Sequence, residues 1–188
     1  MQRNYKFYAL YLQTENYSMR QLLFVLSILT LLFLASCKKN TTSSCGYTVS
    51  TVVVPAAEQQ ALHDSLTAHG INATLNSSGF YYNINAAGSG PSATSLCSTY
   101  SVFYRGGFLN GQGFDSSKTG VPVIFNLGQV IPGWQKGLPL VSKGGDITLY
   151  IPPSLGYGST NVTDSSGHVV IPANSNLVFR VVVADVQP

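Results

Sequence analysis

The sequence has few charged residues and few histidines. Asp, Glu, Lys and Arg make up 9% of its 188 residues, against about 25% in typical soluble proteins. The formal net charge of +3 is too small, and its charges too scattered, to favour nucleic-acid binding. Three scattered histidines predict no catalytic triad, and His63 and His69, six residues apart on one predicted helix, predict no metal pair. No phosphate-binding loop, zinc-binding helix or nucleophile elbow occurs in the sequence.

The sequence also lacks an apolar run long enough to span a bilayer. Leu22–Leu34 is almost purely apolar, but counted to Cys37 the run has only 16 residues, against about 17–25 for a spanning helix. It ends in Leu34-Ala35-Ser36-Cys37, which resembles the lipobox of bacterial lipoprotein signal peptides. The resemblance implies that residues 1–36 are removed and that lipid is attached to Cys37. A secretory peptide cut at an ordinary small-residue site and an uncleaved anchor are the alternatives.

A lipidated Cys37 would anchor the mature chain to the bacterial cell envelope. We expect it on the outer membrane, on the periplasmic side or at the cell surface, with residues 37–46 as the lipidated cysteine and a polar tether. Met19, just before the apolar run, is an alternative translation start. Without residues 1–36, seven basic and six acidic residues remain, so the mature chain is nearly neutral and has little electrostatic attraction to acidic lipid.

The three cysteines fit an exported protein. If lipid occupies Cys37, then Cys45 and Cys97 remain as a pair, and an oxidising compartment would favour a disulfide between them. Such a bridge would close a loop of about 50 residues, worth about 4 kcal/mol in the chain-entropy model. Two separate buried thiols are the alternative.

Residues 47–78 predict a strand followed by a helix. Tyr47–Val54 is rich in β-branched residues, which favour a strand, and Pro55 is suited to the first position of a helix. An apolar stripe then runs along the predicted helix to a glycine stop, through Ala57, Ala61, Leu62, Leu66 and Gly70. The stripe is too narrow to decide between dimerisation and packing on the rest of the chain.

The remaining residues predict an antiparallel sheet with one short helix. Aromatic and β-branched runs bounded by Gly, Ser and Asn predict strands at 79–85, 99–109, 121–127, 145–151 and 176–186. Gly113–Gly120 predicts a turn region. Pro132–Leu140 has a helix-start proline and two glycines, so it predicts at most a short helix. The pattern as a whole predicts an α+β fold.

Several blocks after Val102 carry a family resemblance. They are Val102-Phe103-Tyr104-Arg105-Gly106 and the segments 110–117, 125–138, 151–158 and 171–179. In this order and spacing they closely resemble the FKBP-type peptidyl-prolyl cis-trans isomerase domain, over about residues 79–188. The resemblance implies a twisted antiparallel β-sheet wrapped around a short α-helix, with an apolar cleft between them.

The resemblance also implies which residues form the cleft. The catalytic set would be Phe114, Asp115, Trp134, Tyr157 and Phe179, with the Trp134 indole as the floor under the substrate proline ring. Further substrate contacts would come from Tyr104, Val123, Phe125, Val130, Ile131 and Ile171. The Ile131 backbone N–H and the Tyr157 hydroxyl would donate to substrate carbonyls.

The implied activity is cis–trans isomerisation of X-Pro peptide bonds, which would assist the folding of exported or envelope proteins. The barrier to this rotation is peptide resonance, about 18–20 kcal/mol, so a cleft that stabilises the twisted state needs no cofactor or metal. The expected partners are proline-containing polypeptides, the membrane and macrolide inhibitors, but no nucleic acid. A non-catalytic proline-peptide-binding chaperone or assembly module and a purely structural lipoprotein are the alternatives.

The sequence departs from the family pattern at several positions. Val123 stands where a phenylalanine is usual, Gln129 replaces a frequent acidic residue, and Ala173 replaces the second proline of an Ile-Pro-Pro turn. The loop over residues 158–170 is longer than in the smallest members and rich in Ser, Thr and Asn. These differences bear on substrate preference and macrolide affinity more than on the fold.

Overall fold

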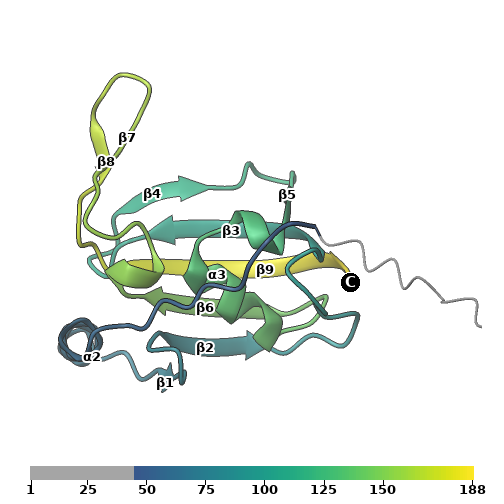
Figure 1. The fold of residues 1–188 in the computed structure, drawn as a ribbon, viewed down its shortest axis with the longest axis horizontal. Coiled ribbons are helices and arrows are strands. Elements are labelled where there is room, and N and C mark those ends of the chain that lie inside the picture. Colours follow the sequence, from purple (N-terminus) through teal and green to yellow (C-terminus); the bar gives the residue numbers. More distant parts are fainter. Residues whose placement is uncertain (1–44) are drawn as a thin grey trace, which may run out of the picture. The chain divides into compact units, whose positions relative to one another are not determined.

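A seven-stranded antiparallel sheet dominates residues 45–188, the part of the chain that the computed structural model describes (Figure 1). The predicted signal peptide, the lipidation of Cys37, the Met19 start and the tether up to residue 44 lie outside the described residues. The strands lie in the order β1 (Thr74–Leu75), β2 (Tyr81–Ala86), β6 (Asp146–Ile151), β9 (Leu177–Gln187), β3 (Thr99–Gly107) and β4 (Gly113–Ser116), and β5 (Val123–Asn126) also pairs with β3.

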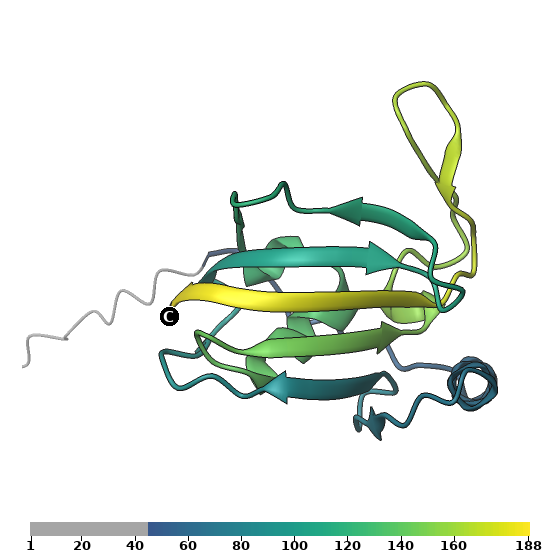
Figure 2. The same cartoon turned by 180° about the vertical axis from the view of Figure 1, so that it is seen from behind.

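The long pair of β3 and β9 forms the centre of the sheet (Figure 2). Alternate residues of β9 from Leu177 to Val183 are buried, which is the period expected of a strand with one face on a core. Ser101 pairs with Asp185 and Val102 with Val183, so Ala184 is an extra residue in β9. This bulge returns Val186 to the buried face.

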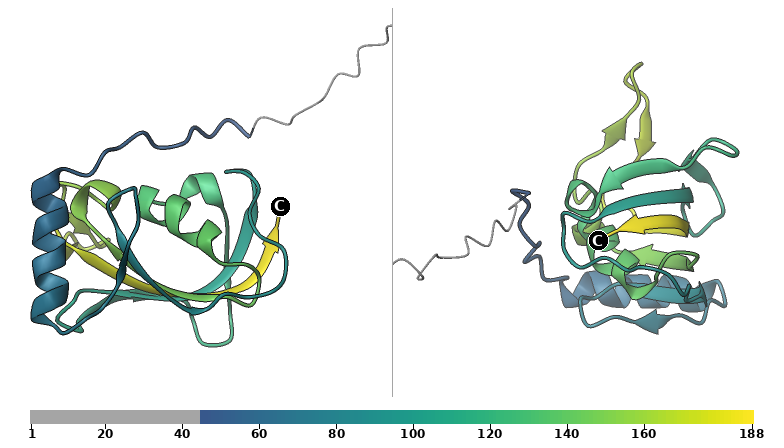
Figure 3. Two further views of the ribbon diagram at one scale, coloured as in Figure 1. Left: turned by 90° about the horizontal axis from the view of Figure 1, so that it is seen from below. Right: turned by 90° about the vertical axis from the view of Figure 1, so that its right-hand side faces the viewer.

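The short helix α3 (Pro132–Gly137) packs against one face of the curved sheet (Figure 3). Pro132 lies in its first turn, and the 3-10 turn η2 (Leu138–Leu140) follows it. A Cβ atom added at Gly133 would lie 2.7 Å from Ile151, and one at Gly137 would lie 2.6 Å from Leu149. The two glycines, one helical turn apart, therefore let α3 approach β6 closely.

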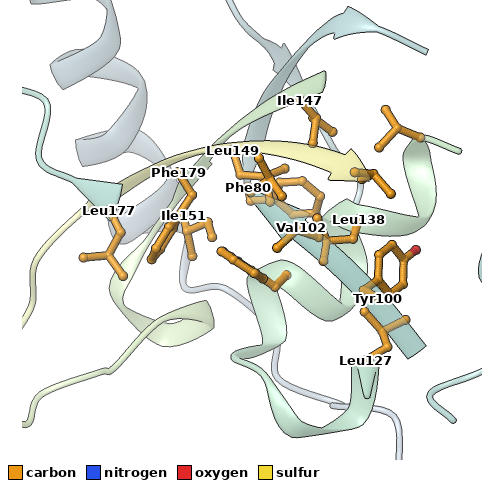
Figure 4. Close-up of a cluster of buried hydrophobic side chains, with 14 of the residues drawn as sticks. Phe80, Tyr100, Val102, Leu127, Leu138, Ile147, Leu149, Ile151, Leu177 and Phe179 are labelled. Carbon is orange, nitrogen blue, oxygen red and sulfur yellow. The ribbon is translucent and has the colours of Figure 1, made fainter. Parts of the chain in front are cut away.

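Most of the core lies between the sheet and α3. Figure 4 shows side chains from β3, β6 and β9 converging with Leu138 and with Leu127 of the 3-10 turn η1 (Leu127–Gln129). A smaller cluster joins helix α2 (Ala56–Ala68) to the sheet, where Leu62 and Leu66 pack with Tyr81 and Tyr150. Leu62 and Leu66 of the predicted stripe are thus used for packing within the chain, whereas Ala57 and Ala61 are exposed.

The structure has no strand at Tyr47–Val54, where the sequence predicts one. Residues 45–55, the N-terminal segment, are instead attached to the rest of the chain by a disulfide and a hydrogen bond. A disulfide joins Cys45 to Cys97, and the Lys136 ammonium donates a hydrogen bond to the Ser50 carbonyl oxygen at 3.2 Å. β-branched residues favour strands when they fit a pleated, half-buried surface, and this segment pairs with no strand of the sheet.

Two other predictions need correction. Gly113–Gly120 is predicted as a turn region, but its first four residues form β4, which pairs with the end of β3. The 158–170 loop contains a small hairpin of β7 (Val162–Thr163) and β8 (Val169–Ile171), which projects from the sheet in Figure 1. The other predicted strands and both helices agree with the structure to within a few residues. Within residues 45–188, no helix is both long and apolar enough to cross a bilayer.

Candidate active site

An open cleft of about 350 Å³ lies where α3 faces the ends of several strands. This volume is within the usual range for small-ligand pockets, about 300–1,000 Å³. Its walls are mainly apolar and aromatic, with one carboxylate. The lining residues are Tyr104, Asp115, Val123, Phe125, Gln129, Val130, Ile131, Trp134, Tyr157 and Phe179.

Trp134 forms the centre of an aromatic cluster at the bottom of the cleft. Its side chain is only 6% exposed, because α3 packs closely on β6 and directs the indole between the sheet and the cleft. The ring centroids of Phe179, Tyr104 and Phe125 lie 5.2, 5.4 and 5.5 Å from the indole centroid. The Tyr104 and Phe179 rings stand nearly perpendicular to the indole, an edge-to-face geometry that aromatic rings favour.

A glycine makes room for the next layer of rings. A Cβ atom added at Gly106 of β3 would lie 2.6 Å from the Phe179 ring and 2.8 Å from the Phe114 ring. These two rings pack edge to face at 5.5 Å. Gly106 therefore allows Phe114 to support Phe179, which in turn forms one wall of the cleft.

The polar part of the cleft is the pair of Tyr104 and Asp115. The Tyr104 hydroxyl donates to Asp115 Oδ2 at 2.5 Å, and the Ser116 backbone N–H donates to Oδ1 at 2.8 Å. Both residues are positioned by the pairing of β3 with β4. Burial, and next the hydrogen bond to Asp115, raise the pKa of Tyr104 well above its usual value. The phenol therefore stays protonated at neutral pH and orients the carboxylate.

Tyr157 also lines the cleft, and it follows the 3-10 turn η3 (Pro153–Leu155). The Gly156 and Gly158 N–H groups both donate to the Pro153 carbonyl oxygen at 2.9 Å, which closes the turn that presents Tyr157. The side chain is 41% exposed. Burial, followed by the negative charge of Asp115, raises the pKa of the Tyr157 phenol. Its hydroxyl is thus a protonated donor at the mouth of the cleft.

Two glutamines hold the segment that contains Val130 and Ile131. The Gln129 side chain accepts a hydrogen bond from the Asn126 N–H at 2.9 Å. The Gln135 amide donates to the Val130 carbonyl oxygen at 2.9 Å from inside α3. Ile131 is the residue before the helix, and its carbonyl oxygen accepts from the Trp134 N–H at 2.9 Å. The backbone around Ile131 is therefore fixed relative to the indole.

The structure brings most, but not all, of the predicted site residues to the cleft. Asp115, Trp134, Tyr157 and Phe179 line it, together with Tyr104, Val123, Phe125, Val130 and Ile131. Phe114 and Ile171 are not among the lining residues. The Phe114 ring packs on the rings of Phe179 and Phe108, and Ile171, as buried as Phe179, packs in the same core cluster.

One lining residue, Gln129, is absent from the predicted substrate contacts. It immediately precedes Val130 and Ile131, which are predicted substrate contacts. This position in the sequence is the signal by which Gln129 could have been predicted as a lining residue. Among the described residues, no group of three or more His, Cys, Asp or Glu side chains is placed to hold a metal ion. The lining of the cleft offers apolar walls, the phenols of Tyr104 and Tyr157 and the carboxylate of Asp115.

Comparison with known proteins decides the family. Residues 90–184 match the family model described as FKBP-type peptidyl-prolyl cis-trans isomerase. The chain belongs to this FKBP family. It is 44% identical over 113 residues to the FKBP-type isomerase FkpA of Escherichia coli, covering 60% of this chain and 39% of that protein. It is 46% identical over 122 residues to a probable FKBP-type isomerase of Haemophilus influenzae, covering 64% and 48%.

Solved structures of FKBP proteins have the same fold. The crystal structure of FkpA from Escherichia coli superposes with a TM-score of 0.55 at 36% identity, covering 71% of this chain and 64% of that one. The crystal structure of AtFKBP13 gives a TM-score of 0.56 at 32% identity, covering 62% and 99%. The predicted fold class and family are thereby confirmed. The matched region spans less than half of the curated relatives' own length.

Proposed function

We propose that this FKBP chain catalyses the cis–trans isomerisation of X-Pro peptide bonds in proline-containing polypeptides. The observation that carries the proposal is the cleft itself: a buried indole floor, aromatic walls, and a protonated Tyr157 hydroxyl at the rim. A proline ring is a compact apolar group of the size that such a floor accommodates. Membership of the isomerase family supports the same reaction.

The cleft is suited to this reaction because the reaction needs no group transfer. Resonance gives the peptide C–N bond its rotational barrier of about 18–20 kcal/mol. Polar solvent supports the charge-separated resonance form, and transfer to an apolar cleft removes that support. Binding that is tighter for the twisted amide than for either planar isomer lowers the barrier. The cis and trans isomers of X-Pro bonds differ by only about 0.5–1 kcal/mol, so catalysis speeds a nearly balanced step.

Each polar group then has a role in holding the twisted peptide. We assign the Tyr157 hydroxyl and the Ile131 backbone N–H as donors to substrate carbonyl oxygens, and Trp134 as the surface under the proline ring. Asp115, which Tyr104 and Ser116 orient, supplies the only negative charge among the lining residues. Phe114 acts through Phe179 by packing rather than by contact with substrate.

The same proposal extends to the location of the protein. An oxidised Cys45–Cys97 pair suits a compartment outside the cytoplasm. We propose a lipid anchor at Cys37 in the cell envelope, where the substrates are exported polypeptides that fold slowly at X-Pro bonds. Macrolide inhibitors that bind other FKBP domains are candidate ligands of the same cleft.

A protease-coupled assay on short X-Pro peptides tests the activity. The uncatalysed reaction takes about 10–100 s at 25 °C, which leaves a wide window for detecting acceleration. Tyr157→Phe keeps the wall and removes one donor worth about 0.5–1.5 kcal/mol, so kcat/KM should fall by about 2- to 13-fold. Tyr82→Phe, outside the cleft on β2, is the matched control and should be unchanged.

The alternatives give different results in the same experiment. A chain that binds X-Pro peptides without accelerating their isomerisation is a binding module rather than an enzyme. A chain that neither binds nor accelerates would contradict both functions and leave a structural role.

A further inference from the structure

Glu58 reaches the active-site turn from helix α2, outside the region that matches the FKBP family model. Its carboxylate Oε2 accepts a hydrogen bond from the backbone N–H of Ser154 at 3.0 Å. The two residues are 96 positions apart in the sequence. Ser154 lies in η3, and Tyr157 follows three residues later.

The hydrogen bond to Glu58 gives the Ser154 N–H a partner that η3 itself does not provide. The first N–H groups of a helical turn have no partner within the turn. In η3 the first residue is Pro153, which has no N–H, and no side chain of the turn caps it. Ser154 is therefore the first free donor, and Glu58 accepts from it. Hydrogen bonds to a charged acceptor are stronger than those between neutral groups.

Glu58 is itself held firmly. It lies in the first turn of α2, and one turn later Leu62 is completely buried against Tyr81 and Tyr150. Tyr150 belongs to β6, the strand that runs directly into η3. Helix α2 thus packs on β6 and, through Glu58, also contacts η3, the turn that follows β6. Glu58 is half-buried.

We propose that Glu58 is a positioning residue for Tyr157: its carboxylate caps η3 and so fixes the turn Pro153–Gly158, which presents the Tyr157 hydroxyl to the substrate. The inference rests on the proposed isomerase function of the cleft. It makes α2, which lies outside the family match, part of the active-site support. Since Glu58 acts through Tyr157, the effects of removing Glu58 and of removing the Tyr157 hydroxyl should overlap rather than multiply.

The test compares variants of the full oxidised chain. Glu58→Ala and Glu58→Asp should each lower kcat/KM by about 3- to 10-fold, since both withdraw the acceptor, whereas Glu58→Gln keeps an acceptor oxygen and should stay within about twofold. Glu58→Asp keeps the negative charge in the first turn of α2, so it tests the loss of the Ser154 contact with the favourable charge at the helix N-terminus retained. Asp64→Ala is the control: it removes an exposed carboxylate of α2 that accepts a hydrogen bond from Gln60 of the same helix.

A double-mutant cycle separates positioning from general stability. In the Tyr157→Phe background, Glu58→Ala should have almost no further effect on kcat/KM, because the group through which it acts is gone. Amide hydrogen exchange at Ser154 should be faster in Glu58→Ala and Glu58→Asp than in the Asp64→Ala control. Independent, multiplying effects of Glu58→Ala and Tyr157→Phe would overturn the inference.

The failure of this inference differs from failure of the proposed function. If the wild-type chain accelerates isomerisation and Glu58→Ala matches Asp64→Ala, only the positioning role is refuted. If the wild-type chain neither binds nor isomerises X-Pro peptides, the function is refuted and the positioning role is refuted with it.

Discussion

The packing around Gly106 allows a quantitative test of how the cleft wall is built. Gly106 is the second-last residue of β3, and its backbone does not adopt the left-handed conformation that favours glycine. What it provides is space, because a Cβ atom there would lie 2.6 Å from Phe179 and 2.8 Å from Phe114. Both contacts are too short for carbon atoms, whose best separation is about 3.5–4.0 Å. In Gly106→Ala at least one aromatic ring must therefore move.

The size of the effect follows from two opposing contributions. Overpacking of a core costs about 1–3 kcal/mol, whereas alanine in place of glycine reduces unfolded-state entropy and stabilises by about 0.4–1 kcal/mol. We expect Gly106→Ala to lower the free energy of unfolding by about 1–2 kcal/mol. Because the displaced Phe179 ring is a cleft wall, kcat/KM for an X-Pro peptide should also fall, by about tenfold if the ring shift costs 1.4 kcal/mol of transition-state binding.

The assay is urea unfolding of the oxidised chain together with the protease-coupled activity measurement. Gly113→Ala, in the neighbouring strand β4, is the control, because its Cβ would meet nothing closer than 3.7 Å. It should leave activity unchanged and stability unchanged or slightly higher. Adding Phe114→Leu to Gly106→Ala should restore part of the lost activity by freeing space beside Phe179. If Gly106→Ala matches Gly113→Ala in both measurements, the proposed packing of Phe179 is wrong.

Two further predictions concern the disulfide and the phenols. The double variant Cys45→Ser, Cys97→Ser removes a disulfide between residues 52 positions apart, and the free energy of unfolding should fall by up to about 4 kcal/mol. Urea unfolding of the variant and of the oxidised wild type measures the difference. Equal stabilities would contradict this prediction. The pKa values of Tyr104 and Tyr157 are raised in the folded chain, so unfolded molecules lose these protons first and stability should fall as the pH rises above about 10. Unfolding from pH 8 to 11 should show a steeper loss for the wild type than for a Tyr104→Phe, Tyr157→Phe variant, and parallel curves would refute the assignment.

Much of the site is predictable because its residues fall in short, separate blocks of sequence. Trp134, Tyr157 and Phe179 each lie in such a block, and the strands between them have regular alternation of apolar and polar residues. The period of β9 from Leu177 to Val183 fixes which side chains face the core. A cleft then follows once the family's arrangement of the blocks is assumed.

Other features depend on contacts that no local pattern encodes. The polar segment Gly113–Ser116 becomes β4 only because the end of β3 offers it an edge. The β-branched residues after Tyr47 form no strand: the segment pairs with no strand of the sheet, and the disulfide and a hydrogen bond from Lys136 tie it to other parts of the chain. Phe114 and Ile171 resemble cleft residues in sequence, yet one packs behind Phe179 and the other is buried in the core. An apolar residue in the sequence does not reveal whether its side chain will line the cleft or pack in the core next to the cleft.

The N-terminal residues illustrate why a family match understates the extent of an active site. The match begins at residue 90, but earlier residues contact the elements that form the cleft. Besides the pairing of β2 with β6, three contacts come from residues before β1. The Cys45–Cys97 disulfide anchors the N-terminal segment beside β3, Ser50 accepts a hydrogen bond from Lys136 of α3, and Glu58 caps the turn before Tyr157. Two of these contacts fall on α3 and η3, which carry the floor and a rim donor of the cleft. A truncated chain that starts at the match would keep every lining residue but lose these supports together with α2, β1, β2 and the buried Phe80. It should therefore be less stable, and a poorer catalyst, than the chain with them.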